Sequence, residues 1–328
     1  MSWLESSFMA RRGVAGGKPG TTHELTMEKQ GKYHYVYGPY VDPVLHIQPG
    51  DIVVAETHDA FEGKLKTEQD KPSEKLNMPF GNPQNGPIHV AGVVKGDVIA
   101  VHIHDIAPRG PQPVGTTVLM HGFGGLVATN NTAMLHDPLP EMVRKMTVDR
   151  SGIQFNEKIK LPYEPFLGTL GVSPEIEAVS AVQPDYWGGN MDLPDMAPGA
   201  VAYFPVHHEG GYVYLGDCHA TQGDGELAGA AIEMPATVTI QIDLIKNWPI
   251  KWPRLENEEF IMAIGSTRPM EDAARIAYCE LIDWMVKDYG FDKLEAYLLL
   301  TQAGRVRLGN MVDPKYTLGA SIKKSIIG

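Results

Sequence analysis

The sequence predicts a mainly β protein, with a β-sandwich-like core, α/β decoration and helices near its C-terminal end. Three observations carry this prediction. The 328 residues include 35 glycines and 25 prolines, and so many turn-forming residues are typical of a chain of short strands. Several segments alternate apolar and polar side chains with the period of a half-buried strand. The apolar spacing of a long helix is clear only late in the chain, before Gly290.

The first 22 residues are polar and rich in glycine, which predicts a flexible N-terminal arm, or one that is ordered by a partner subunit. Residues 23–328 contain no segment with the composition of a linker, so we expect them to form a single domain. A β-rich chain with a long arm often uses a second copy of itself, and we therefore expect a homodimer.

Strands are expected where apolar or alternating segments lie between turn signals, namely at residues 52–59, 98–105, 200–206, 212–215 and 237–244. The first two follow Gly-Asp turns, and the last alternates apolar and polar residues without interruption. Gly210-Gly211 lies between the third and the fourth segments. This dipeptide predicts a hairpin that pairs those two strands.

Two helices are expected near the C-terminus. Ser266 or Thr267 can cap the first, and Pro269 suits its first turn. Gly290 is expected to end it. Its apolar face should consist of Ala274, Ala277, Leu281, Trp284 and Met285. A second, shorter helix is expected over roughly residues 292–302, where apolar side chains recur at helical spacing.

Composition restricts the classes of partner. A formal net charge of −12 without a long run of Lys or Arg disfavours a nucleic acid, and suits a neutral or cationic small molecule better. Two cysteines, Cys218 and Cys279, are too few for a disulfide framework and indicate a reducing compartment. With no secretory h-region and no run of 18 apolar residues, we expect a cytoplasmic protein without a membrane partner.

The densest group of reactive side chains lies between Asp217 and Glu226. Asp217 and His219 are two residues apart, so on a strand both leave the same face and can hold one cation. Gln222, Asp224 and Glu226 repeat the two-residue spacing around two glycines. Such a cluster is costly to bury without a cation or mutual hydrogen bonds, and it predicts a metal or catalytic site.

A second element is the segment from Trp187 to Asp192, which reads Trp-Gly-Gly-Asn-Met-Asp. Its two glycines mark an unusual turn that presents Asn190 and Asp192 on one side, as further ligands or as contacts to a substrate amide. For both segments, the alternative is an exposed loop with ordinary surface charges.

These segments carry a resemblance to a known family. Residues 188–192, 216–226 and 229–234 closely resemble the signature of the acetamidase/formamidase family. Shorter landmarks, the last of them at residues 306–314, extend the resemblance over roughly residues 30–325. The resemblance implies a β-sandwich-like fold and the hydrolysis of a short carboxamide, such as formamide or acetamide, to carboxylate and ammonia. It also implies a bound divalent metal, with zinc favoured over calcium.

The resemblance, carried over position by position, implies the site residues. The expected metal ligands are Asp59, Asp192, Asp217 and His219. Asn190 and Gln222 are expected to bind the substrate amide. The general base that later protonates ammonia is expected among Glu226, Asp224 and Glu233. The expected reaction is attack by a metal-activated water.

Several alternatives stay open. A thiol nucleophile at Cys218 is disfavoured, because strand alternation points it away from His219. His207 or His208 can reach a metal or simply lie at a strand edge. The scaffold can also act on a larger or cyclic amide such as an imide, perform a lyase step, or only bind a metal or a small molecule.

Overall fold

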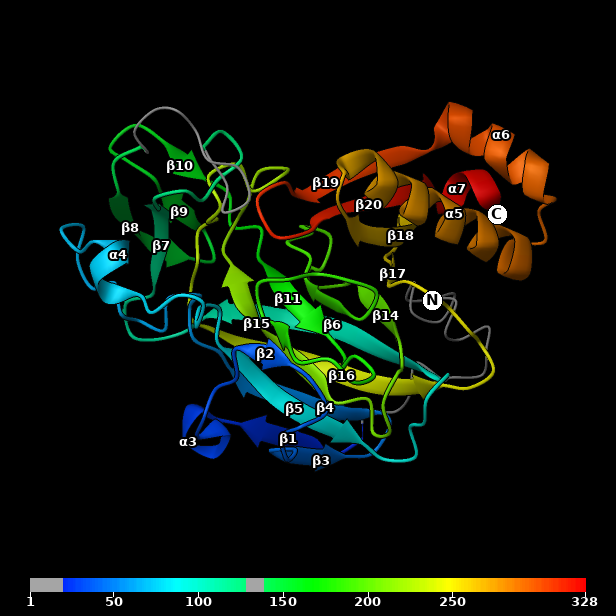
Figure 1. The fold of residues 1–328 in the computed structure, drawn as a ribbon, viewed down its shortest axis with the longest axis horizontal. Helices are drawn as coiled ribbons and strands as arrows, with labels where there is room; N and C mark the ends of the chain where they lie inside the picture. The colour runs from blue at the N-terminus through cyan, green and yellow to red at the C-terminus, as the bar shows by residue number, and fades with distance from the viewer. Residues whose placement is uncertain (1–19, 128–138) are drawn as a thin grey trace.

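The computed structural model describes residues 20–127 and 139–328, which form a mainly β protein (Figure 1). A nine-stranded and a five-stranded sheet lie at its centre, a four-stranded sheet lies to one side, and two longer helices lie near the C-terminus. The fold class that the sequence predicts is confirmed.

The nine-stranded sheet joins strands from both halves of the chain and contains four of the five expected strands. In spatial order it consists of β1 (Thr22–Leu25), β4 (Asp51–Glu56), β16 (Ala236–Ile245), β6 (Val98–Pro108), β14 (Val201–Pro205), β17 (Arg254–Glu256), β18 (Phe260–Thr267), β20 (Tyr316–Lys323) and β19 (Arg305–Asn310). β1 and β4 pair in parallel, and the other neighbours run antiparallel.

The five-stranded sheet carries the segments in which the sequence predicts the site. In spatial order it consists of β13 (Gly188–Asn190), β11 (Phe166–Gly171), β15 (Val213–His219), β5 (Gln84–Val90) and β3 (Leu45–Ile47). Because β13 and β15 both pair with β11, the two polar segments that follow them come close together in space.

The main apolar core lies between these two sheets. The nine-stranded sheet contributes inward side chains such as Val101 and Ile240, and the five-stranded sheet contributes Leu170 and Leu215, all fully buried. Two sheets that share one core across their facing surfaces form a sandwich, which agrees with the predicted architecture.

Smaller elements complete the fold. The four-stranded sheet consists of β10 (Lys160–Leu161), β9 (Gly152–Gln154), β8 (Met142–Asp149) and β7 (Val114–Leu119), and a two-stranded sheet pairs β12 (Val179–Ser180) with β2 (Val36–Tyr37). The short helices are α3 (Met27–Gln30), α4 (Pro72–Lys75) and α7 (Lys324–Ile327). Thr116 of β7 pairs with the backbone of Glu233 and so connects this sheet to the site described below.

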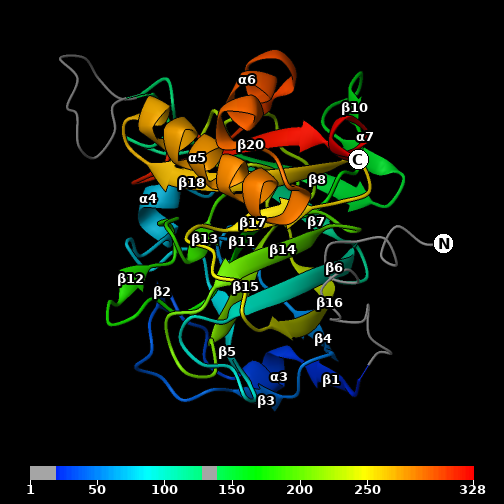
Figure 2. The same ribbon diagram turned by 90° about the vertical axis from the view of Figure 1, so that its right-hand side faces the viewer.

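The two longer helices lie close to their expected positions. α5 (Met270–Tyr289) packs against β18 and β20 (Figure 2), and Gly290 ends it with a φ of 74°. α6 (Lys293–Ala303) follows it. The predicted caps Ser266 and Thr267 are wrong, because both residues belong to β18.

Pro269, expected in the first turn, stands at the N-cap of α5. On the apolar face, Ala273 is buried where Ala274 was expected, and Ala274 is half-buried. The four other expected residues of this face are buried. The helix therefore starts later than predicted.

The predicted hairpin around Gly210-Gly211 is wrong. β14 belongs to the nine-stranded sheet and β15 to the five-stranded sheet, so the two glycines lead the chain from one sheet to the other. Both have positive φ values, 77° and 70°, which glycine adopts at little cost. Each strand is buried along its whole length, and such a pattern identifies a strand without identifying its partner.

Residues 1–19 of the predicted N-terminal arm lie outside the described residues. Next to them, the N–H of Gly20 donates to the carbonyl of Gly50, and Thr22 begins β1 and pairs with Ile52 of β4. Within residues 20–127 and 139–328, no helix combines the length with the hydropathy that a membrane crossing requires.

Candidate active site

Side chains from distant segments meet at the end of β15 and in the segments that follow β13, β15 and β19. They are buried and, apart from one imidazole, all acidic: Asp192, Asp217, His219, Glu226, Glu233 and Asp313. The antiparallel pairing of β11 with β13 and β15 brings the first three together. Ligand atoms lie within 4.8 Å of one another in two groups, which share His219: Asp192, His219 and Glu226, and Asp217, His219 and Glu233.

The backbone at the site is unusual. Asp192, Asp217 and Glu226 have positive φ values of 48°, 55° and 48°, which non-glycine residues rarely adopt. Such conformations are held only where the surroundings impose them, and they gather at functional sites.

On the neighbouring strand β11, Gly168 gives the carboxylates room. A Cβ at position 168 would lie 2.7 Å from Oδ2 of Asp217 and 2.8 Å from Oδ1 of Asp192, which is too close for any side chain. The two carboxylates can take these positions only because this residue is a glycine.

The centre of the cluster contains polar atoms that have no hydrogen-bond partner. Among the described residues this holds for Nε2 of His219, Oε2 of Glu233 and Oδ1 of Asp192, although all three atoms are buried. Nε2 of His219 lies 3.2 Å from Oε2 of Glu233 and 3.4 Å from Oδ2 of Asp217. Two ligands of one tetrahedral zinc ion are separated by about 3.4 Å, given zinc-to-ligand distances of about 2.1 Å. The donor set and its spacing therefore fit a divalent cation.

Burial and mutual repulsion change the pKa values of the carboxyl groups. Burial, with the charges of neighbouring carboxylates, holds the pKa of Asp192 and Glu226 well above the usual range. Burial likewise raises the pKa of Glu233 to about 8 and that of Asp313 to about 7. Burial also acts to raise the pKa of Asp217, but a positive charge on His219 and the hydrogen bonds with His219, Glu233 and Thr169 together outweigh it, and the net pKa is lowered.

Asn190 organises the carboxylates. Its Nδ2 donates to Oδ2 of Asp192 at 3.0 Å and to Oδ2 of Asp313 at 2.8 Å. Its Oδ1 accepts from Asn82 at 2.7 Å and from the hydroxyl of Thr169. Asn190 was expected to bind the substrate amide, but here its donors and acceptor are used within the protein.

Two predicted site residues lie elsewhere. Oδ1 of Asp59 accepts the N–H groups of Phe61 and Gly63, at 3.0 and 2.8 Å, and so stabilises a turn. Asp224 is exposed and forms an ion pair with Arg307 at 2.8 Å. Neither belongs to the two groups of potential ligands found in the described part of the chain.

Asp313 is a site residue that the sequence reasoning missed. It lies in the segment that follows β19, and its carboxylate reaches Asn190. The only signal for it was its place in the last landmark of the family resemblance, residues 306–314.

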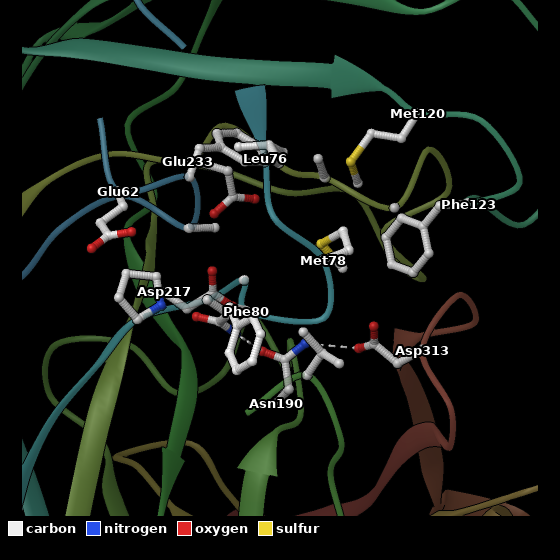
Figure 3. Close-up of a pocket in the computed structure, with 18 of the residues that line it drawn as sticks. Glu62, Leu76, Met78, Phe80, Met120, Phe123, Asn190, Asp217, Glu233 and Asp313 are labelled. Atoms are coloured by element: carbon white, nitrogen blue, oxygen red, sulfur yellow. Dashed lines mark hydrogen bonds between the residues drawn. The ribbon is translucent and has the colours of Figure 1, made fainter. Parts of the chain in front are cut away.

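A cavity of about 130 Å³ opens onto the cluster. Figure 3 shows Asn190, Asp217, Glu233 and Asp313 around it, with Glu62 on another side and apolar side chains forming much of the remaining wall. The apolar lining includes Phe61, Leu76, Met78, Phe80, Met120 and Phe123. The cavity is small beside the roughly 300–1,000 Å³ of pockets that take drug-sized ligands, and it suits a small molecule with an apolar part.

Cys218 points away from the cluster, as expected. It is fully buried, its Sγ lies 3.5 Å from the hydroxyl of Thr57, and burial raises its pKa to about 12. A thiol with such a pKa is a poor nucleophile. His207 and His208 do not belong to either of the ligand groups found among the described residues, and their rings pack against Tyr186 and Tyr212.

Comparisons with known proteins agree with this geometry. The model of the Acetamidase/Formamidase family matches residues 21–183 and 175–326. The crystal structure of an acetamidase from Yersinia enterocolitica is similar over 99% of both chains, with 55% identity and a TM-score of 0.97.

More distant relatives carry the same family names. An acetamidase from Bacillus halodurans is 25% identical, with a TM-score of 0.84 over 93% of this chain and 98% of that chain. A formamidase from Methylophilus methylotrophus is 25% identical over 274 residues. This match spans 67% of this chain and 66% of the formamidase, just under two thirds of its length.

Proposed function

Because this chain belongs to the acetamidase/formamidase family, we propose that it hydrolyses a short carboxamide to a carboxylate and ammonia with the help of a divalent cation. One observation carries the proposal. Next to the carboxylates that line a small cavity, Nε2 of His219 is buried without a hydrogen-bond partner among the described residues. It lies 3.2 Å from Oε2 of Glu233 and 3.4 Å from Oδ2 of Asp217, a spacing that a cation fits.

We assign the cation to Nε2 of His219, the residue that both ligand groups share, and to one carboxylate from each group, Asp217 and Asp192. The hydroxyl of Thr169 donates to Oδ2 of Asp217 at 3.1 Å, which favours the ionised form that a ligand must have. When bound, a divalent cation polarises the amide carbonyl and lowers the pKa of a water molecule toward about 7. Zinc suits this nitrogen and oxygen donor set.

We assign proton transfer to Glu233, with Glu226 beside it. Both line the cavity, and the N–H of Ala231 holds one oxygen of each, at 2.9 and 3.0 Å. Their raised pKa values set them apart from the ionised Asp217, and such a difference is how two carboxyl groups in one site take different roles. Glu233 takes a proton from the attacking water and returns it to the departing ammonia.

The substrate lies with its amide toward the carboxylates and its acyl group against the apolar walls. Asp313 lines the cavity and offers an acceptor for the amide N–H. Met78 and Phe80 stand at the mouth, 56% and 53% exposed, and contact whatever extends beyond a short acyl chain.

Two measurements test the proposal. Metal analysis of the purified protein should find bound divalent metal, zinc first. Ammonia release should be measured with formamide, acetamide, propionamide, longer amides and cyclic imides, and short linear amides should be the best substrates. Metal-loaded protein that releases ammonia from none of them contradicts the proposal, and preference for an imide supports the cyclic-amide alternative.

A homodimer stays a prediction. What supports it is an apolar stripe along the outer side of α6, where Leu294, Tyr297 and Leu298 are 69%, 63% and 66% exposed. Light scattering of the wild type and of a Tyr297→Asp variant measures the oligomeric state. A cytoplasmic location also stays a prediction.

A further inference from the structure

We propose that Gln222 is a positioning residue that keeps the proton of His219 on Nδ1 and so leaves Nε2 for the cation. The sequence reasoning expected Gln222 to bind the substrate amide. The new role depends on the proposed function only for the identity of what binds Nε2.

The orientation of the Gln222 amide follows from its neighbours. Nε2 of Gln222 donates to the carbonyl of Asp192 and to the carbonyl of Gly309, both at 2.9 Å. Carbonyl oxygens only accept, so the opposite orientation would place the amide oxygen against two other oxygens. The nitrogen of the amide is therefore fixed, and with it the oxygen.

This orientation decides which nitrogen of the imidazole carries a proton. Oε1 of Gln222 lies 2.9 Å from Nδ1 of His219, and an amide oxygen is an acceptor alone. Nδ1 must then be the donor. The ring of Phe166, edge-on to the imidazole with 4.9 Å between ring centroids, restricts its rotation.

The other nitrogen faces the carboxylates. Nε2 of His219 is buried, has no hydrogen-bond partner among the described residues, and lies 3.2 Å from Oε2 of Glu233. A ligating histidine whose second nitrogen donates to an oxygen acceptor is held in one tautomer and one orientation. Gln222 supplies that acceptor here.

Gln222 has no donor left for a substrate. Both hydrogens of its amide go to backbone carbonyls, and its oxygen accepts from the imidazole. Its three partners lie in the segment that follows β13, on β15 and on β19. It therefore fixes the imidazole relative to two other parts of the site.

The first experiment compares zinc affinity among variants by competition with a chelator. Gln222→Met removes the acceptor and both donors and should lower the affinity by about 10- to 100-fold. Gln222→Glu also loses both donors and sets an oxygen against the carbonyls of Asp192 and Gly309, but it keeps an acceptor toward Nδ1 and should therefore bind zinc more tightly than Gln222→Met. If Gln222 only tied segments together, both variants would lose affinity equally, and that result overturns the proposal, as does wild-type affinity in Gln222→Met.

Gln30 offers a matched control. It is buried, donates to the carbonyls of Lys32 and Gly86, both at 3.0 Å, and accepts from the N–H of Gly86, so its bonds have the same pattern without an imidazole. Gln30→Met should destabilise the protein and leave zinc affinity unchanged. An equal loss of zinc affinity in this variant would show that loosening the fold is sufficient.

The second experiment is independent of variants. NMR of zinc-loaded wild-type protein with ¹⁵N-labelled histidine should show Nδ1 of His219 protonated and Nε2 bound to zinc, whereas a protonated Nε2 overturns the proposal. If the wild type binds no zinc, the proposed function fails. The Nδ1–H signal of the metal-free protein, present in the wild type and in Gln222→Glu but displaced in Gln222→Met, then still decides the role of Gln222.

Discussion

Two groups of buried charges in this protein are built in opposite ways. Below α5, the guanidinium of Arg254 is fully buried, bonds Glu280 at 2.9 and 2.8 Å, and lies 5.0 Å from the ring centres of both Trp248 and Trp284. At the candidate active site, five carboxyl groups surround the single imidazole of His219.

The difference separates a structural from a functional use of buried charge. In the C-terminal group the chain supplies the cation itself, and aromatic faces complete its surroundings. At the site the carboxylates exceed the positive charge, and buried carboxylates without counter-charges must take up protons or a cation. The raised pKa values of Glu226 and Glu233 are the sign of this excess.

The largest expected effect comes from a substitution in the cluster of acidic residues at the candidate active site. Glu233→Gln should lower amide hydrolysis by about 10²- to 10⁴-fold, because it removes the group that moves the proton, while bound zinc is retained. Steady-state kinetics and metal analysis measure both. Asp224→Asn, at the exposed acid paired with Arg307, is the control and should keep nearly full activity. Full activity in Glu233→Gln would transfer the role to Glu226.

The next largest effect is expected from a substitution in the buried ion pair of Arg254 and Glu280. Arg254→Leu removes the cation and leaves Glu280 buried without its partner, which should cost about 3–5 kcal/mol in the free energy of unfolding. Urea denaturation measures this loss. Arg275→Leu, on the exposed side of α5, the helix that carries Glu280, is the control and should change stability little. Equal stability of both variants would contradict a structural role for Arg254.

A smaller effect is expected in the pH dependence of the free energy of unfolding. Burial raises the pKa of Glu233 from 4.5 to about 8, so its contribution to the stability of the metal-free protein is complete below pH 4.5 and lost as pH rises through 8. The neutral side chain in Glu233→Gln has no such dependence. The unfolding free energy of metal-free Glu233→Gln should therefore gain on that of the wild type between these pH values, and a constant difference contradicts the assignment.

The smallest effect concerns the mouth of the cavity. Phe80→Ala removes an apolar contact worth about 1 kcal/mol and should raise KM for propionamide by about 2- to 10-fold, with kcat nearly unchanged. Formamide, which has no acyl carbon chain, is the matched substrate and should be affected less. An equal rise in KM for both amides would place the acyl group away from Phe80.

The sequence predicted five of the strands, β4, β6, β14, β15 and β16, and it singled out the two segments that meet at the candidate site, because both depend on local spacing. Asp217 and His219 are two residues apart, and they do face the same cluster. The positive φ of Asp217 shows that simple strand alternation was an incomplete reason. The pairing of strands was harder to predict from the sequence. β14 and β15 follow each other along the chain but lie in different sheets, because tertiary packing decides which strands pair.

The remaining differences between the expected and the observed surroundings of site residues have the same origin. Asp59 and Asp224 occupy positions that the family resemblance suggested, but their hydrogen bonds go to a local turn and to Arg307. Asp313 is separated from Asn190 by more than a hundred positions, and no local periodicity connects them. Gln222 was found by its spacing, yet its partners on other strands define what it does.

Gly168 contributes to the site through the space that its missing side chain leaves on β11. Oxygens of Asp217 and Asp192 occupy the space that a methyl group on β11 would fill, so their positions depend on a residue with no chemistry of its own. Alanine at this position changes neither the charge nor the donors of the site, and it would still displace both oxygens. A chain of this fold with a larger residue there must place these two carboxylates differently.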